Sequence, residues 1–272
     1  MANFFENKVV MVTGATSGIG KSLAQQLLQA GARVSICGRN ANSLQELKTA
    51  WNNHNLLTVT ADVSIEADCQ RFVNETIQQF GQLDVLINNA GISMRALFND
   101  VDLNVLRQSM DINFWGTVYC CKYALPHLLK TKGHIAGISS IAGYKGLPCR
   151  TGYSASKFAM QGFLESLRIE NLYTGVNVLW ISPGFVASNI RNTALNAGGK
   201  QQAETPLDES KLMSPDECAR RILNAIEQRK RTLVMSRQGI LTVWMNKFFP
   251  RFVDKKAYEL FAAEPDSPLK KH

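Results

Sequence analysis

The 272-residue sequence has no apolar run approaching the roughly 20 residues that a membrane span needs. Its first residues, Met1 to Lys8, also lack the apolar core of a secretory signal. The six cysteines form no Cys-x-x-Cys pair and the four histidines are dispersed, so no metal site is indicated. We therefore expect free thiols in a reducing compartment and a cytoplasmic protein.

Charged residues are sparse, at 19% of the chain, whereas 45% of the residues are apolar, which suffices for one large core. The net charge of +8 leaves three kinds of partner open: nucleic acid, a membrane surface or an anionic ligand. Because the basic residues are scattered and do not interleave with aromatic residues, we expect no nucleic-acid partner.

Short aliphatic runs alternate along the chain with segments that carry apolar residues at helical spacing. Such runs, without polar alternation, are typical of strands buried on both faces of a parallel sheet. The sequence thus predicts an α/β fold, a doubly wound Rossmann-type parallel sheet of seven strands flanked by helices on both faces. Ligands bind such sheets at the carboxyl ends of the strands. The seven runs are Val9–Val12, Val34–Ile36, Leu56–Val59, Val85–Ile87, Ile135–Ile138, Val176–Ile181 and Leu233–Met235.

The chain has no obvious interdomain linker. We assign residues 1–237 to one catalytic domain and residues 238–272 to a C-terminal helical extension. An irregular polar stretch lies at about 188–215. Because a long insertion in a compact domain is often functional, we expect a substrate lid there, with a flexible surface loop as the alternative.

A glycine-rich turn joins the first expected strand to the first expected helix. In this turn Gly14 permits a tight bend, Gly18 permits close approach of a pyrophosphate, and Gly20 permits the helix to pack on the strand. The free N–H groups at the start of the helix would bind phosphate oxygens. The turn therefore predicts a dinucleotide site that includes Gly14, Thr16, Ser17, Gly18, Ile19 and Gly20.

The second expected strand ends at Arg39, without the carboxylate that usually holds the ribose 2′-hydroxyl of NAD. Arg39 can pair with a 2′-phosphate, which favours NADP(H), whereas a solvated arginine is the alternative. Asp62 can accept a hydrogen bond from adenine or cap the next helix. Gly91, after the fourth strand, leaves room for the cofactor. We therefore expect NADP(H) to contact Arg39, Asp62, Val63, Asn89, Ala90 and Gly91.

Tyr153 and Lys157 stand four residues apart and so share one face of an expected helix. A nearby ammonium and a positive nicotinamide ring would favour the phenolate, so we expect Tyr153 to act as general acid and base. Ser139 and Ser140 follow the fifth strand, where a hydroxyl could hydrogen-bond a substrate oxygen. Asn113, in a helical pattern, could hold a water that links Lys157 to solvent.

As a set, these motifs and Pro183-Gly184 resemble the short-chain dehydrogenase/reductase family over nearly the whole chain. The resemblance implies an oxidoreductase that moves a hydride between NADP(H) and an alcohol or carbonyl compound, working as a homodimer or homotetramer. It favours Ser140 over Ser139, and it places Ser188 where the family often has a threonine. The tetrad it implies is Asn113, Ser140, Tyr153 and Lys157, and its further cofactor contacts are Tyr153, Lys157, Pro183, Gly184, Val186 and Ser188.

The apolar residues expected around the substrate are Met94, Leu147, Phe185 and Val186, and few charged residues are obvious nearby. This composition favours a lipophilic ketone, aldehyde or secondary alcohol as the substrate. The alternative functions are an NADP-sensing regulatory protein and a membrane-attached binding protein, both without turnover. The presence of Tyr153 argues against a sensor, which would not need it.

The tail from Gly239 to Phe261 mixes aromatic and basic residues, and Pro250 would interrupt a continuous helix. Two interpretations fit this composition. The tail could close the substrate site or form a dimer contact, or it could lie in a membrane surface as an interfacial helix. We prefer the packed tail and keep peripheral membrane contact open.

Overall fold

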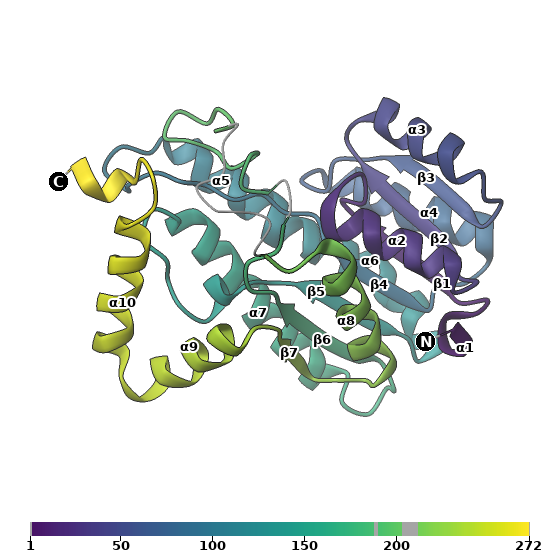
Figure 1. Cartoon of the computed structure of the whole chain (residues 1–272). Helices are drawn as coiled ribbons and strands as arrows, with labels where there is room; N and C mark the ends of the chain where they lie inside the picture. The colour runs from purple at the N-terminus through teal and green to yellow at the C-terminus, as the bar shows by residue number, and fades with distance from the viewer. Residues whose placement is uncertain (1, 188–189, 203–211, 272) are drawn as a thin grey trace.

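A computed structural model of the chain describes residues 2–187, 190–202 and 212–271. Seven parallel strands form one sheet in the order β3-β2-β1-β4-β5-β6-β7, so the strand order reverses between β1 and β4 (Figure 1). The expected doubly wound fold is confirmed. The strands are β1 (Val9–Thr13), β2 (Arg33–Gly38), β3 (Leu56–Thr60), β4 (Val85–Asn88), β5 (His134–Ile138), β6 (Asn177–Ser182) and β7 (Thr232–Val234).

Helices cover both faces of the sheet because the central strands are aliphatic on both sides. The helices α2, α3 and α8 pack on one face, and α4, α6 and α7 pack on the other. The helices are α1 (Ala2–Phe5), α2 (Gly18–Gln29), α3 (Ala41–Trp51), α4 (Glu66–Phe80), α5 (Leu103–Met110), α6 (Gly116–Thr131), α7 (Thr151–Glu170), α8 (Pro215–Glu227), α9 (Arg237–Phe248) and α10 (Pro250–Ala262).

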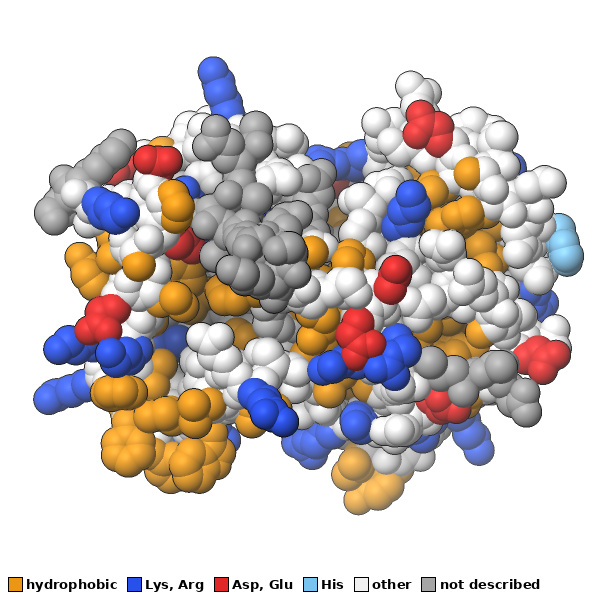
Figure 2. Space-filling model, viewed as in Figure 1, with side chains coloured by type: hydrophobic (Ala, Val, Ile, Leu, Met, Phe, Trp, Pro, Cys, Tyr) orange, Lys and Arg blue, Asp and Glu red, His pale blue; other side chains and the backbone are white. Residues whose placement is uncertain are grey.

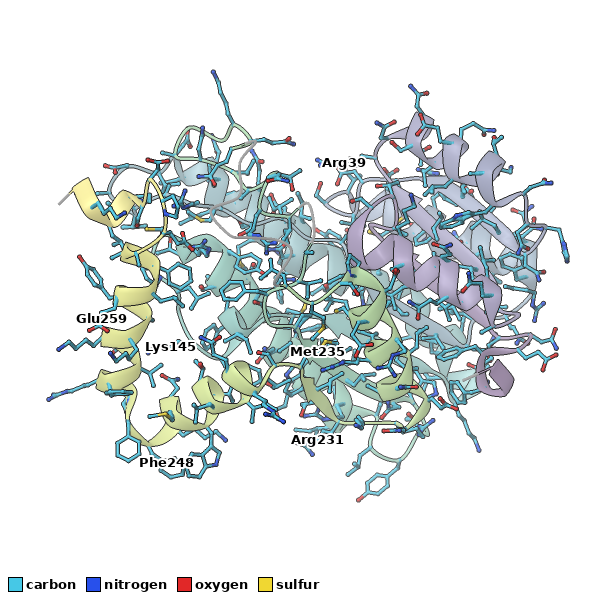
Figure 3. The ribbon with its side chains drawn as sticks, in the orientation of Figure 1. Arg39, Lys145, Arg231, Met235, Phe248 and Glu259 are labelled. Atoms are coloured by element: carbon cyan, nitrogen blue, oxygen red, sulfur yellow. The ribbon has the colours of Figure 1, made fainter. Side chains whose placement is uncertain are left out.

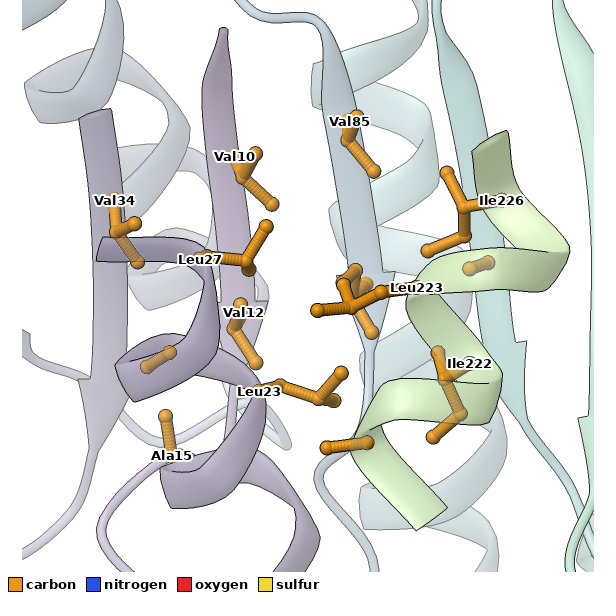
Figure 4. Close-up of a cluster of buried hydrophobic side chains, with 14 of the residues drawn as sticks. Val10, Val12, Ala15, Leu23, Leu27, Val34, Val85, Ile222, Leu223 and Ile226 are labelled. Carbon is orange, nitrogen blue, oxygen red and sulfur yellow. The ribbon is translucent and has the colours of Figure 1, made fainter. Parts of the chain in front are cut away.

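The first core lies between the sheet and the adjacent helices α2 and α8. Leu23 and Leu27 of α2 are fully buried and point toward the valines of β1 and toward Leu223 of α8 (Figure 4). Each aliphatic side chain buried in this way contributes about 2 kcal/mol. This packing fixes the start of α2, and with it the glycine turn, against the carboxyl end of β1.

The second core lies under α4, α6 and α7 and holds several of the cysteines. All six cysteines of the chain are free and buried, as expected from their spacing. Burial raises the pKa of both Cys37 and Cys121 to about 12, so these thiols stay protonated at neutral pH. They act as small apolar side chains of the core.

The C-terminal helices form an L-shaped arm at the end of the molecule remote from α3 (Figure 1). Pro250 is the first residue of α10, so the chain turns where the proline was expected to interrupt a helix. The start of α9 packs closely on the loop after β5, because a side chain at Gly239 would lie 2.7 Å from Ile141 Cδ1. Asn246 donates a hydrogen bond of 3.2 Å to the Tyr144 carbonyl. Among the described helices, none has the length and apolar character needed to cross a bilayer.

Candidate active site

The glycine turn has the left-handed backbone that its sequence suggested. Gly14 has φ +63° and Gly18 has φ +53°, conformations that residues with a side chain rarely adopt. A Cβ at Gly14 would lie 2.8 Å from Ala90 Cα, so the turn and the loop after β4 touch. A Cβ at Gly20 would overlap the Asn89 amide and the Gly14 carbonyl oxygen. The lack of a side chain at Gly20 therefore leaves space for Asn89 of the loop after β4, whereas the sequence suggested that it lets the helix pack on the strand.

Hydrogen bonds lock that loop to the end of β1. The Thr13 hydroxyl oxygen accepts from the backbone N–H of Asn89 at 2.9 Å and of Ala90 at 3.0 Å. The Asn89 side chain donates to the carbonyl oxygens of Thr13 and Gly14, at 2.9 and 3.0 Å. Asn89 thus holds the floor of the site in place. Sequence analysis assigned no role to Thr13, which lies between the first expected strand and the glycine turn.

The two side chains expected around the adenosine lie at the ends of β2 and β3. Arg39 lines the cavity and forms no ion pair with a described carboxylate. Asp62 also lines the cavity, but its carboxylate already accepts from the Ser64 N–H at 3.0 Å and the Ser64 hydroxyl at 2.7 Å. Asp62 therefore forms a local turn with Ser64 and does not cap α4, which begins after Ile65 without a side-chain cap, and one oxygen of the carboxylate is committed to this turn.

Asn113 lies in a π-helical turn, Asp111–Trp115, inserted between α5 and α6. The sequence pattern indicated a regular helix, and a single wide turn leaves no trace in such a pattern. The Asn113 side chain accepts from the Ile92 N–H at 2.8 Å. It donates to the Ile92 carbonyl at 3.0 Å and to the Ser156 hydroxyl at 2.8 Å. Asn113 therefore joins the loop after β4 to α7, and it lies behind the cavity wall.

Ser140, Tyr153 and Lys157 line one cavity together with the glycine turn. Lys157 is 3% exposed, and its ammonium donates to the Ile138 carbonyl at 2.8 Å. The same ammonium lies 5.8 Å from the centre of the Tyr153 ring. The Ser139 hydroxyl accepts a 2.8 Å hydrogen bond from Gln161, whereas the Ser140 hydroxyl accepts from the Ala142 N–H at 3.2 Å and hydrogen-bonds to Tyr153. This difference favours Ser140 as the serine that faces a substrate.

Burial acts on both members of the Tyr153–Lys157 pair. Burial raises the pKa of the Tyr153 phenol above its usual value, against the opposing effects of the Ser140 hydrogen bond and the positive charge of Arg150. Burial also lowers the pKa of Lys157 to about 7. The phenol is therefore protonated at neutral pH, and a positive nicotinamide ring beside it would favour the phenolate.

The cavity has a volume of 1120 Å³ and reaches from β2 to the C-terminal helices. Leu147, Phe185 and Val186 line it as expected, but Met94 lies in a separate apolar cluster beneath the wall. The described segment 190–202 also lines the cavity. Of the expected contacts, Gly20 and Asn113 lie outside the lining and Ser188 lies outside the described residues. The lining contacts are Gly14, Thr16, Ser17, Gly18, Ile19, Arg39, Asp62, Val63, Asn89, Ala90, Gly91, Ser140, Tyr153, Lys157, Pro183, Gly184 and Val186.

The expectation of few charges around the substrate region is wrong. Lys145 and Arg150 line the cavity, and each is ion-paired with a residue of the C-terminal extension. Lys145 pairs with Asp254 of α10, as Figure 3 places it facing that helix. Their partners lie more than a hundred residues away along the chain, so no local pattern could have revealed them.

The carboxylate of Glu264 bridges two arginines at the far end of the cavity. It lies 3.3 Å from Arg150 and 3.2 Å from Arg95, and all three side chains are nearly buried. The Arg150 guanidinium also lies 4.4 Å from the centre of the Phe261 ring. Since Arg150 is one of the charges that act on Tyr153, the end of the chain contributes to the electrostatics of the site.

Comparisons with known proteins agree with this geometry. Residues 8–198 match the family model described as short chain dehydrogenase. The chain is 37% identical to the mouse protein "Dehydrogenase/reductase SDR family member 7B", over 86% of this chain and 74% of that protein. It is 36% identical to "11-beta-hydroxysteroid dehydrogenase-like 4A" of Arabidopsis thaliana, over 92% and 83%.

Among solved structures, a short chain dehydrogenase/reductase from Burkholderia phymatum, in complex with NAD, has a TM-score of 0.81. It is 21% identical and covers 91% of this chain and 95% of its own, which shows the shared fold. Because the family match extends over well over half of the sequence, and the curated relatives over most of it, the chain belongs to the short-chain dehydrogenase/reductase family of oxidoreductases.

Proposed function

We propose that the protein transfers a hydride between NADP(H) and a lipophilic carbonyl compound or secondary alcohol, with Tyr153 as general acid and base. One observation carries this proposal: the phenol of Tyr153, the hydroxyl of Ser140 and the buried ammonium of Lys157 line the same cavity as the glycine turn. A reacting carbonyl can therefore reach proton donor and dinucleotide together.

The residues present fit a dinucleotide phosphate. Ser17 precedes α2 without capping it through its side chain, so N–H groups at the start of this helix remain available to a pyrophosphate. The positive φ at Gly14 and Gly18 keeps that turn free of side chains. Arg39 supplies a cation without an ion-pair partner among the described residues, which suits the 2′-phosphate of NADP(H). The bound cofactor would supply the hydride and, when oxidised, a positive ring.

Each polar residue then has a separate task in reduction. Ser140 donates a hydrogen bond to the carbonyl oxygen and stabilises the negative charge that develops there. Tyr153 gives its proton to the same oxygen, since its phenol is protonated at neutral pH. Lys157 stabilises the phenolate that is left. Asn113 hydrogen-bonds both to the loop after β4 and to α7, and so fixes the position of α7 relative to that loop.

The lining supports a lipophilic substrate. The described apolar side chains on the substrate side of Tyr153 include Leu147, Phe185, Val186 and Leu195. The nearby cations Lys145 and Arg150 are each ion-paired with a carboxylate, which partly offsets their attraction for an anion. We also propose that segment 190–202 acts as part of a lid, since it lines the cavity and pairs with Met94 through Leu195.

We propose a homodimer through the outer faces of α6 and α7. Trp115, just before α6, and Phe158 on α7 are large apolar side chains exposed by more than two fifths. Two helices with exposed aromatic residues offer a self-complementary surface. Light scattering during size-exclusion chromatography tests this, with Phe158→Ser expected to yield monomers.

Oxidation of NADPH in the presence of a panel of carbonyl compounds tests the proposed reaction. We expect aliphatic and polycyclic ketones to be reduced faster than short charged ones, and NADPH to be used in preference to NADH. Tyr153→Phe should lower kcat/KM about 10³-fold while leaving the affinity for NADPH unchanged. A sensor without turnover would bind NADPH but would not oxidise it with any carbonyl compound of the panel, and Tyr153→Phe would then change nothing.

A further inference from the structure

Four aromatic side chains are exposed where α9 meets α10. Trp244, Phe248, Phe249 and Phe252, which we call the aromatic corner, are 61%, 61%, 58% and 50% exposed. The rings of Trp244 and Phe248 lie 4.9 Å apart, so these two side chains pack against each other. Figure 2 shows it as an apolar projection at the end of the molecule, and Figure 3 shows Phe248 pointing outward from it. A cluster of this kind marks an interaction surface.

Basic residues surround the aromatic corner. Lys247, Arg251 and Lys255 are exposed and belong to the same two helices. None of the three forms an ion pair with a described carboxylate. The two acidic residues of these helices are engaged, Asp254 with Lys145 and Glu259 with Lys256. The surface therefore presents aromatic side chains together with positive charges that no described carboxylate pairs with.

We propose that the aromatic corner docks the protein onto the surface of an anionic lipid bilayer. Aromatic side chains with flanking lysine and arginine are the combination that enters the interfacial region of a membrane, where rings sit among headgroups and cations meet anionic lipids. A second copy of the chain fits less well. A twofold contact through this surface would place its own cations against each other without a carboxylate between them.

The docked surface lies next to the cavity. Thr242 of α9 and Val253 of α10 line the cavity from the inner sides of the helices that carry the aromatic corner on their outer sides. A helix with its side chains is about 10–12 Å across, so only that thickness separates the bilayer from the cavity. Leu260 lines the cavity and is itself 47% exposed, which places an opening beside α10. A lipophilic substrate would then enter from the bilayer, a consequence that rests on the proposed function.

Flotation of the full-length protein with vesicles tests the docking directly. Vesicles of phosphatidylcholine alone and vesicles that also contain phosphatidylserine provide neutral and anionic surfaces. Three cations near an anionic surface should make binding to the second on the order of a hundredfold tighter than to the first. The preference should weaken as salt is raised, because the charges are exposed.

Two triple variants remove the two components of the surface separately. The first is Trp244→Ala with Phe248→Ala and Phe252→Ala, and the second is Lys247→Glu with Arg251→Glu and Lys255→Glu. We expect the first to lose binding to both vesicles and the second to lose only the anionic preference. The matched control, Leu172→Ser with Tyr173→Ser, alters two side chains that are 63% and 95% exposed after α7, and it should bind like wild type. Melting temperatures establish that each variant is folded.

Three results would overturn the proposal. The wild-type protein could fail to float with anionic vesicles, or both triple variants could float as it does. A wild-type dimer that becomes monomeric only in the aromatic variant, with no vesicle binding, would identify a second copy as the occupant.

Activity distinguishes this proposal from the proposed reaction. A water-soluble carbonyl compound should be reduced equally by wild type and both triple variants, whereas one dissolved in anionic vesicles should be reduced on the order of tenfold more slowly by the variants. Vesicle binding without turnover of any carbonyl would contradict the reaction and leave the docking intact.

Discussion

Ionisable side chains lie at both ends of the central strands, but the groups that surround them differ. At the amino ends of β4 and β5, Asp84 accepts from the Val9 N–H and the Gln82 amide, both at 2.8 Å. At the carboxyl ends, the Lys157 ammonium donates a hydrogen bond to the Ile138 carbonyl, and both Lys157 and Tyr153 line the cavity. At the amino ends, hydrogen-bond donors of the protein satisfy the Asp84 carboxylate. At the carboxyl ends, the cavity leaves room for a ligand beside Lys157 and Tyr153. Burial alone therefore does not identify a functional group.

The largest effect should come from removing the charged side chain of Lys157 at the carboxyl ends of the strands, in comparison with Asp84 at the amino ends. Lys157→Met should lower kcat/KM about 10³-fold, because it removes the cation that stabilises the phenolate. Its free energy of unfolding should be unchanged or higher at pH 7 and below. The lowered pKa of about 7 means that burial of the charged amine costs stability fully below that pH, and less as pH rises toward the usual value.

Asp84→Ala is the counterpart at the amino end. It should lower the free energy of unfolding by about 2–3 kcal/mol, because the buried Val9 N–H loses its acceptor. The kcat/KM of the folded fraction should not change. Chemical denaturation and steady-state kinetics of both variants provide the test, and a destabilised Lys157→Met would remove the distinction between the two ends.

The next largest effect concerns pH at the amino end. Burial, aided by the charge of Arg229, lowers the pKa of His134 to about 4. Between about pH 6.5 and 4, His134 is therefore protonated in the unfolded chain but neutral in the folded chain. The free energy of unfolding falls as pH decreases through that range, by up to about 3 kcal/mol. His134→Gln should abolish this part of the pH dependence of the melting temperature. The exposed His54→Gln should retain it, and an equal effect of both would refute the assignment.

A smaller effect should appear where the C-terminal extension reaches the carboxyl edge. Glu264→Gln removes the charge between Arg95 and Arg150 and should cost about 2 kcal/mol, since both arginines are nearly buried. Glu165 also contacts two arginines, Arg168 and Arg231, but is half exposed, so Glu165→Gln should cost less than about 0.5 kcal/mol. Urea denaturation compares the two. Equal costs would mean that the extension does not stabilise this edge.

The smallest expected effect is at Arg39. Arg39→Met should weaken NADPH binding about tenfold and leave NADH binding unchanged, because only the 2′-phosphate distinguishes the two. Fluorescence titration with each dinucleotide measures both affinities. A parallel loss for NADH would show that Arg39 contacts a shared part of the cofactor, and no loss would indicate the solvated arginine that the sequence left open.

Much of the site could be predicted because it follows the carboxyl ends of recognisable strands. The glycine turn, Asn89 and Ser140 each come directly after such a strand, and parallel strands bring their ends together. Tyr153 and Lys157 were found from helical spacing. The π-helical turn around Asn113 was not predictable, since one wide turn barely changes the periodicity.

The sequence by itself determined the order of strands and helices, the glycine turn and the pairing of Tyr153 with Lys157. These are local patterns, read from spacing along the chain. The tertiary structure alone decided that Glu264 pairs with Arg150, that Asp254 pairs with Lys145, and that burial raises the pKa of Tyr153. Charge and burial act between groups that are close in space, and these groups are brought together only when the chain folds.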